Sequence, residues 1–163
     1  MKTEIVWVRI DTRIIHGQIV VKWSKKVGCK SVVVVDKNLA ADPFMANFYK
    51  MSAPSGFDVT MVTAEKAKEM WDTDGFNTDK TMIICKDASN LYDLWKTGFP
   101  LPLVDIGNQV SAPGKTQILT EVFLSQDEVN KLKEIRDSGV NVFMQIIPEY
   151  DQYDFDYILS KFK

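Results

Sequence analysis

Residues 4–20 read EIVWVRIDTRIIHGQIV, and this stretch sets the organisation of the chain. Its first seven residues, 4–10, are apolar and rich in β-branched side chains, which is typical of a strand buried on both faces of a parallel sheet. From residue 17 onward, apolar positions recur at helical spacing, and Gly28 is expected to end that helix. The stretch therefore predicts a strand, a charged turn and a helix, with His16, the only histidine in the sequence, just before the helix.

The rest of the chain continues this alternation. Further strands are predicted at 31–36, 58–62, 80–85, 103–106, within 117–124 and at 141–147. Further helices are predicted at 42–52, 63–71, 87–96, 125–138 and 153–162, and an exposed loop at 72–79. Such alternation implies right-handed crossovers, so we expect an α/β fold: a doubly wound, mostly parallel sheet of about seven strands with helices on both faces, in one domain, 1–163.

Composition narrows the class of protein. Of the 163 residues, 45% are hydrophobic and 26% are charged, which fits a globular domain and argues against disorder. A net charge of −2, without a basic stripe, argues against nucleic acid as a partner. No signal-peptide pattern precedes the first strand, and no run approaches the ~18–20 apolar residues of a spanning helix, so we expect a cytoplasmic protein. Cys29 and Cys85 lack the spacing of metal ligands or of a redox dithiol.

The turn before the first helix suits phosphoryl chemistry. Imidazole is a nucleophile near neutral pH, so His16 is the candidate catalytic residue. The free N–H groups of a helix start favour a bound anion, and the Arg13 guanidinium suits phosphate. Gly17, which has no Cβ, lets a phosphate approach the backbone. Asp11 either orients the His16 ring or orients Arg13, and the sequence leaves both roles open.

A second loop is expected beside this turn. In doubly wound sheets, ligands bind at the carboxyl ends of the strands. The turn that contains His16 follows one predicted strand and residues 107–109 (Gly-Asn-Gln) follow another, so we expect the two loops to form two walls of one site. Lys115 is a candidate second cation near it. The candidate phosphate- or substrate-binding residues are thus Gly17, Gln18, Gly107, Asn108 and Lys115.

Two other α/β classes do not fit the sequence. Residues 114–116 read Gly-Lys-Thr, but a P-loop also requires a glycine five residues before Gly114, and Gln109 occupies that position. A receiver domain needs an acceptor aspartate at the end of its third strand, whereas the strand at 58–62 continues into Thr63. We therefore favour neither a nucleotide-binding enzyme nor an aspartate-phosphorylated receiver.

Residues 8–20 closely resemble the R-I-D-D-R-L-I-H-G-Q-V motif of the IIB subunits of the mannose/fructose/sorbose family of the bacterial phosphoenolpyruvate-dependent sugar phosphotransferase system. Residues 114–118 (GKTQI) give a second match, and the similarity in length and element order extends over essentially the whole chain. The resemblance implies a phosphotransferase that accepts a phosphoryl group from a IIA phosphohistidine onto Nδ1 of His16, with Asp11 and Arg13 shaping the pocket. It implies transfer to a sugar that enters through the membrane IIC and IID subunits.

The resemblance has further implications. It implies peripheral association with the membrane permease and, as a candidate assembly, a homodimer. Because phosphohistidine is already an activated donor, no metal and no other cofactor are expected. One alternative stays open: a non-catalytic phosphosugar-binding or regulatory module on the same fold, in which Asn108 and Gln109 read the ligand and Arg13 anchors its phosphate.

Two positions depart from the family pattern. Thr12 replaces the second acid of the motif, which removes a negative charge beside the phosphoryl site. Residues 105–109 (DIGNQ) stand where the mannose branch carries N-x-G-G-M. These departures point away from mannose and toward another branch, such as sorbose or an amino sugar.

Overall fold

The computed structural model describes residues 3–162, without the side chains of Gln18, Ile19 and Asn77. Its strands are β1 (Glu4–Ile10), β2 (Ser31–Val35), β3 (Asp58–Val62), β4 (Lys80–Cys85), β5 (Leu103–Ile106), β6 (Lys115–Leu119), β7 (Val122–Ser125), β8 (Asn141–Met144) and β9 (Tyr153–Asp154). Its helices are α1 (Gly17–Val27), α2 (Lys37–Ala40), α3 (Pro43–Ser52), α4 (Ala64–Thr73), α5 (Ala88–Lys96), α6 (Gln126–Asp137) and α7 (Phe155–Ser160), with a 3₁₀ turn at Gly75–Asn77.

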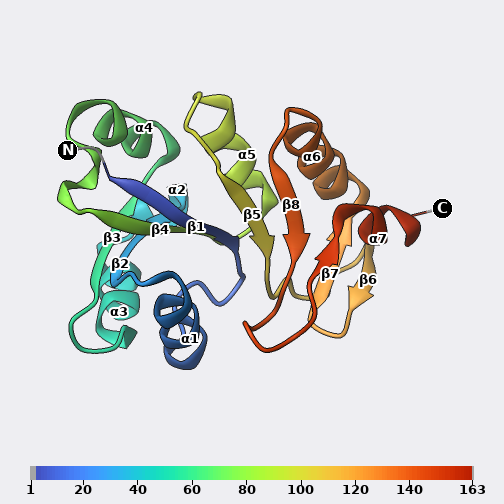
Figure 1. Ribbon diagram of the computed structural model, residues 1–163, viewed down its shortest axis with the longest axis horizontal. Coiled ribbons are helices and arrows are strands. Elements are labelled where there is room, and N and C mark those ends of the chain that lie inside the picture. The colour runs from blue at the N-terminus through green and yellow to red at the C-terminus, as the bar shows by residue number, and fades with distance from the viewer. Residues whose placement is uncertain (1–2, 163) are drawn as a thin grey trace.

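A seven-stranded sheet in the order β3-β2-β4-β1-β5-β8-β9 forms the centre of the molecule (Figure 1). All neighbouring strands in it are parallel except β9, which pairs antiparallel with β8. In register, Ile10 of β1 lies opposite Cys85 of β4 and Ile106 of β5. The carboxyl ends of these three strands therefore meet at one edge, and the predicted α/β fold with a mostly parallel sheet is confirmed.

The two faces of the sheet bury separate apolar clusters. Side chains of a strand point alternately to opposite faces. Val8 and Ile10 accordingly pack with α4, α5, α6 and α7, whereas Trp7 packs on the other face with α1. Trp7 stacks there on Trp23 of α1, with ring centroids 4.4 Å apart. This contact fixes α1, and with it the turn that precedes the helix, against the sheet.

The predicted sixth strand is wrong as a member of the main sheet. Residues 115–125 instead form β6 and β7, a separate antiparallel hairpin. Thr116 and Gln117 are exposed, and only Ile118 of β6 is buried. A central parallel strand must be apolar on both faces, so this segment suits a hairpin with one packed face.

Other boundaries also differ from the prediction. Residues 153–154 form β9, and the last helix begins at Phe155 because the Asp154 carboxylate caps it. Asp36 caps the unpredicted helix α2 by accepting hydrogen bonds from the backbone N–H groups of residues 38 and 39. The predicted exposed loop at 72–79 contains the 3₁₀ turn, in which Phe76 packs near Trp71 and Phe99.

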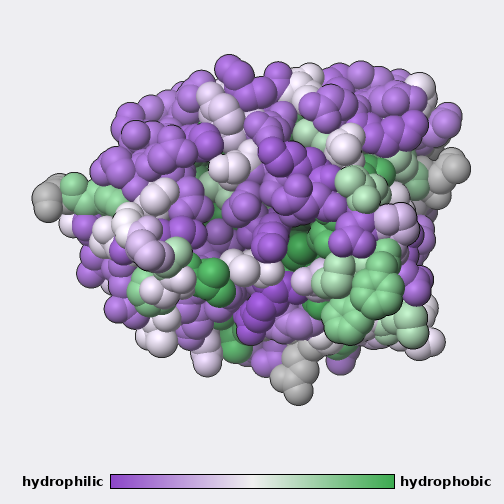
Figure 2. Space-filling model, turned by 180° about the vertical axis from the view of Figure 1, so that it is seen from behind, coloured by the Kyte–Doolittle hydropathy of each residue, from purple (hydrophilic) through white to green (hydrophobic). Residues whose placement is uncertain are grey.

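Most of the surface seen in Figure 2 is hydrophilic, with a hydrophobic patch at the lower right, over α3. The large exposed apolar residues of α3 are Phe44, Phe48 and Met51. Within the part of the chain that is described, no helix combines the length and the apolar character needed to cross a bilayer.

Candidate functional site

The turn between β1 and α1 is closed by Asp11. Its carboxylate accepts a hydrogen bond from the backbone N–H of Arg13 at 3.0 Å, and its carbonyl accepts one from Ile14 at 3.0 Å. Ile14 has φ of 59°, a left-handed conformation that a β-branched residue rarely adopts. The side chains of Ile14 and Ile15 are both buried in the α1-side cluster. The left-handed conformation of Ile14 lets both side chains enter the same cluster, and His16 follows at the N-cap of α1.

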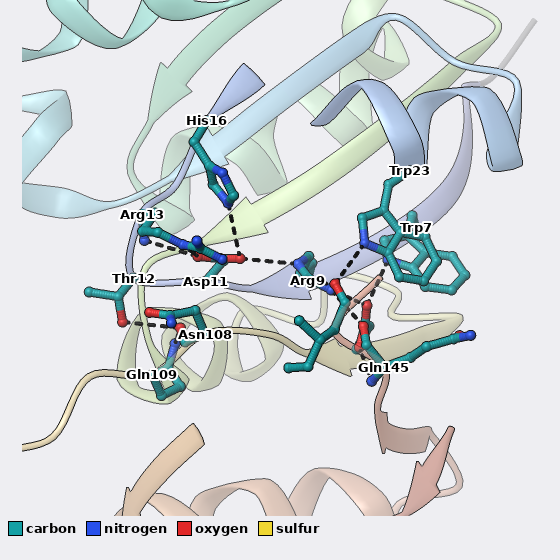
Figure 3. Close-up of polar contacts among 12 residues, drawn as sticks. Trp7, Arg9, Asp11, Thr12, Arg13, His16, Trp23, Asn108, Gln109 and Gln145 are labelled. Carbon is teal, nitrogen blue, oxygen red and sulfur yellow. Dashed lines mark hydrogen bonds and ion pairs between the residues drawn. The ribbon is translucent and has the colours of Figure 1, made fainter. Parts of the chain in front are cut away.

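The His16 ring faces Asp11 with one of its two nitrogens (Figure 3). Nε2 is buried and lies 3.9 Å from Oδ2 of Asp11, slightly beyond hydrogen-bond distance, and has no hydrogen-bond partner among the described residues. The side chain as a whole is 28% exposed. A ring held this way presents Nε2 to the carboxylate and leaves Nδ1 as its other reactive atom.

Asp11 is a buried carboxylate surrounded by donors. Its side chain is 2% exposed, and Nε of Arg9 lies 3.3 Å away and Nε of Arg13 3.5 Å away. Burial by itself would raise the pKa of Asp11, but His16, the Arg9 guanidinium and the Arg13 backbone N–H outweigh it and hold the pKa below 3.8. Asp11 therefore stays an anion across the physiological range and contacts both His16 and Arg13.

Arg9 is the site residue that the sequence analysis missed. Its side chain is 3% exposed and forms ion pairs with Asp11 and Asp105. It also donates hydrogen bonds to the carbonyls of Gln145 at 2.9 Å and Ile146 at 2.8 Å. One buried guanidinium thus joins the carboxyl ends of β1, β5 and β8. An arginine inside an otherwise apolar strand was the available signal, because a buried charge needs partners.

Asp105, at the end of β5, is the second anion held by Arg9. It also accepts hydrogen bonds from the indole N–H of Trp7 at 3.3 Å and the backbone N–H of Gln145 at 2.9 Å. Burial raises the pKa of Asp105 to about 6, although Arg9 and the two N–H donors favour the charged form. The carboxyl group is therefore an anion at neutral pH and gains a proton under mildly acidic conditions.

The two carboxyl groups should titrate far apart. In a carbon-detected NMR titration, we expect the Asp105 carboxyl to have a midpoint near 6 and that of Asp11 a midpoint below 3.8. Asp105 binds its proton more tightly in the folded chain, so its contribution to stability rises as the pH falls from about 6 to 3.8. Asp11 contributes stability above 3.8 that is lost as the pH falls through its lower folded pKa. Equal midpoints would contradict this assignment.

The second loop lies against the first. The carbonyl of Asn108 accepts hydrogen bonds from the backbone N–H of Thr12 at 2.8 Å and from its hydroxyl at 3.1 Å. Oδ1 of Asn108 is buried and has no hydrogen-bond partner among the described residues. Gln109 is 1% exposed, and its amide donates to the carbonyl of Lys86. Gln109 therefore supports the loop from inside, whereas Asn108 lies beside Thr12.

Gly107 gives room to Arg9. A Cβ at this position would lie 2.5 Å from Cζ of Arg9, far closer than a normal contact. Because the guanidinium is fixed by four partners, it cannot easily move aside. The glycine thus has a packing role at the second loop.

We expect Gly107→Ala to lower the free energy of unfolding by about 1–3 kcal/mol, because the added methyl group displaces a tightly held side chain. Urea unfolding followed by tryptophan fluorescence measures this. Gly17→Ala is the matched control, since a Cβ there meets nothing within 4 Å. Equal stability of the two variants would show that Arg9 is not held as described.

The remaining predicted residues differ in placement. Gly17 is exposed, and Arg13 is 44% exposed beside Asp11, so both are accessible from solvent at the turn. The side chain of Gln18 lies outside the described residues. Nζ of Lys115 lies 3.2 Å from Oε1 of Glu128, in the capping box of α6. This ion pair directs the Lys115 ammonium group toward α6.

The fold and the turn define a class: an α/β protein that presents one histidine, next to an exposed arginine, at the carboxyl edge of its sheet. The chain belongs to the family described as PTS system sorbose subfamily IIB component, whose model matches residues 5–163. As a IIB component, it is a phosphotransferase of a sugar phosphotransferase system. The family implies a IIA partner and membrane IIC and IID partners.

Individual relatives agree with this family. The chain is 30% identical over 139 residues to the sorbose-specific EIIB component of Lacticaseibacillus casei, covering 85% of each chain. It is 32% identical over 145 residues to the N-acetylgalactosamine-specific IIB component 1 of Escherichia coli, covering 88% of this chain and 91% of the relative. The solved structure of manxB from Thermoanaerobacter tengcongensis superposes with a TM-score of 0.90 at 32% identity, covering 98% of this chain and 96% of the other.

Proposed function

We propose that His16 carries the phosphoryl group, received from a phosphohistidine of the IIA partner and passed to a sugar delivered by the membrane subunits. The observation that carries this proposal is the contact of the buried Nε2 with the anionic Asp11. The negative charge of Asp11, 3.9 Å from Nε2, favours the tautomer with the proton on Nε2, which leaves the lone pair on Nδ1 as the attacking atom. Asp11 and Arg13 act as its positioning partners.

Phosphoryl transfer at this site exchanges one bond to phosphorus for another, with the attacking and leaving atoms in line. The lone pair of Nδ1 attacks phosphorus as the nitrogen–phosphorus bond of the donor breaks, and Asp11 stabilises the positive charge that develops on the ring. In the second step the oxygen of a sugar hydroxyl attacks phosphorus as the Nδ1–phosphorus bond breaks. The hydroxyl proton passes to water, and His16 is released as neutral imidazole with its proton on Nε2. Arg13 and the free N–H groups at the start of α1 face the phosphoryl oxygens, and one charge-assisted hydrogen bond contributes about 1.5–3 kcal/mol.

We infer that the sugar belongs to the sorbose or amino-sugar branch of the family. The departure from the mannose pattern at 105–109 supports this, as do the sorbose-specific and N-acetylgalactosamine-specific relatives. Gln109 is buried, so its difference from the mannose pattern affects the structure of the second loop and not a bound ligand. Asn108 is the residue of this loop that we expect to contact the sugar. Cytoplasmic location stays a prediction of the sequence, and peripheral association with the permease and a homodimer stay predictions of the family resemblance.

Phosphorylation of the chain itself tests the proposal. Incubation with phosphoenolpyruvate, the general carrier proteins and the IIA partner should give a phosphoryl adduct that is labile in acid and stable in base. The adduct should disappear when washed membranes with IIC and IID and the sugar are added. Tight binding of a sugar phosphate without any adduct would instead favour the non-catalytic module.

A further inference from the structure

A cavity of about 400 Å³ opens between the β6–β7 hairpin and the loop that follows β8. Its walls come from the turn of the β6–β7 hairpin and from the loop between β8 and β9, which runs next to α1 in Figure 1. The wall residues that matter here are Glu121, Ile146, Glu149, Tyr150, Asp151 and Tyr153.

Two wall residues of the cavity are hydrogen-bonded to residues that support the site. The carbonyl of Ile146 accepts a hydrogen bond from Arg9, the residue that holds Asp11. On the hairpin side, the carbonyl of Glu121 accepts a hydrogen bond from the backbone N–H of Gln109 in the second loop. The cavity wall is therefore joined by hydrogen bonds to Arg9, which holds Asp11, and to Gln109 of the second loop.

The chemistry of the walls suits a cation with an apolar stem. Glu121, Glu149 and Asp151 supply three carboxylates, and no lysine or arginine stands among the described residues that line the cavity. The nearby Lys22 reaches Glu149 at 3.4 Å, but the two side chains are 41% and 60% exposed, so water weakens the pair. Tyr150 is 57% exposed. Tyrosine is enriched at protein interfaces, so an exposed tyrosine at this cavity suits contact with a partner.

We propose that this cavity receives a lysine or arginine side chain from the cytoplasmic face of the membrane subunits when the chain delivers its phosphoryl group. The inference rests on the proposed function, since it concerns the second transfer step. Membrane proteins carry an excess of lysine and arginine in their cytoplasmic loops, which matches three carboxylates at a cavity mouth. A guanidinium or ammonium pairs with the carboxylates, and its stem packs on the tyrosine rings.

Other occupants fit the charge less well. A second copy docked through the same face would bring the same three carboxylates to the cavity, and like charges repel. A phosphorylated sugar would bring a further negative charge into an acidic cavity. A cationic loop is the partner whose charge complements the walls.

The test separates the two half-reactions. The variant Glu121→Gln/Glu149→Gln/Asp151→Asn removes the carboxylates without changing the fold around His16. The matched control, Glu65→Gln/Glu69→Gln/Asp72→Asn, changes the net charge equally on α4, which lies toward the opposite end of the sheet (Figure 1). Each chain is assayed for acceptance of phosphate from phosphorylated IIA, and for delivery of it to sugar with inside-out membrane vesicles that contain IIC and IID.

We expect the cavity variant to accept phosphate at the rate of the unchanged chain and to need at least about 10-fold more chain for half-maximal delivery, consistent with the loss of a charged contact. The α4 variant should match the unchanged chain in both assays. Normal delivery by the cavity variant, an equal defect in the α4 variant, a changed KM for the sugar, or a loss of acceptance from IIA would each overturn the proposal. Failure of the unchanged chain to accept phosphate would instead contradict the role of His16.

Discussion

His16→Gln should lower the rate of phosphoryl acceptance from phosphorylated IIA by at least about 10⁴-fold, because it removes the attacking nitrogen of the site. The chain contains no other histidine that could take over. Glutamine keeps a polar side chain of similar length at the N-cap of α1, so the fold should be retained. Quench-flow measurement of radiolabelled phosphate on the chain, with circular dichroism as the folding control, gives the result.

Asp11→Asn should slow phosphoryl acceptance less than His16→Gln does. An amide at this position no longer offers a negative charge to Nε2 and pairs less well with Arg9, so acceptance should slow by about 10- to 100-fold, as for outer partners of functional histidines. If His16 had only a structural role, His16→Gln and Asp11→Asn would both slow phosphoryl acceptance slightly and by similar amounts. Full phosphorylation of the His16→Gln chain would show that another residue accepts the phosphoryl group.

Arg9→Met should lower the free energy of unfolding by about 3–5 kcal/mol, the cost of breaking a buried ion pair by removing one partner. Two buried carboxylates, Asp11 and Asp105, would lose their shared cation, and the carbonyls of Gln145 and Ile146 would lose their donor. Trp7 and Trp23, which stack near this network, report the transition by fluorescence in urea. Acceptance by the folded fraction should also slow, because Asp11 loses its alignment.

A second substitution separates charge from packing. In the double variant Arg9→Met/Asp105→Asn, one of the stranded carboxylates is removed, so part of the lost stability should return. Additive losses of the two substitutions would mean that Arg9 and Asp105 are not coupled in the folded chain.

The regular part of the fold was predictable because its signals are local. The apolar strand at 4–10, Gly28 at the end of α1 and the Ser125–Glu128 capping box are all found as expected. The hairpin at 115–125 and the edge strand β9 were missed because their pairing depends on which neighbours remain available, and a single short segment does not encode that.

The candidate site was predictable only in part for a similar reason. Asp11, Arg13 and His16 lie within six residues, so sequence spacing brings them together. Arg9 points to the α1 side of the sheet and meets Asp105, which is 96 residues away. The packing role of Gly107 depends on that meeting, so neither residue's role could be read before the sheet order was known.

The central claim is that Nδ1 of His16 is the phosphorylated atom, and the ring nitrogens can be observed directly. Because the chain has one histidine, a sample labelled with ¹⁵N-histidine gives the signals of one ring. After phosphorylation by the IIA partner, we predict a ³¹P–¹⁵N coupling at Nδ1, with Nε2 still carrying its proton. A coupling at Nε2, or an unchanged ring in a chain that carries phosphate, would contradict the account.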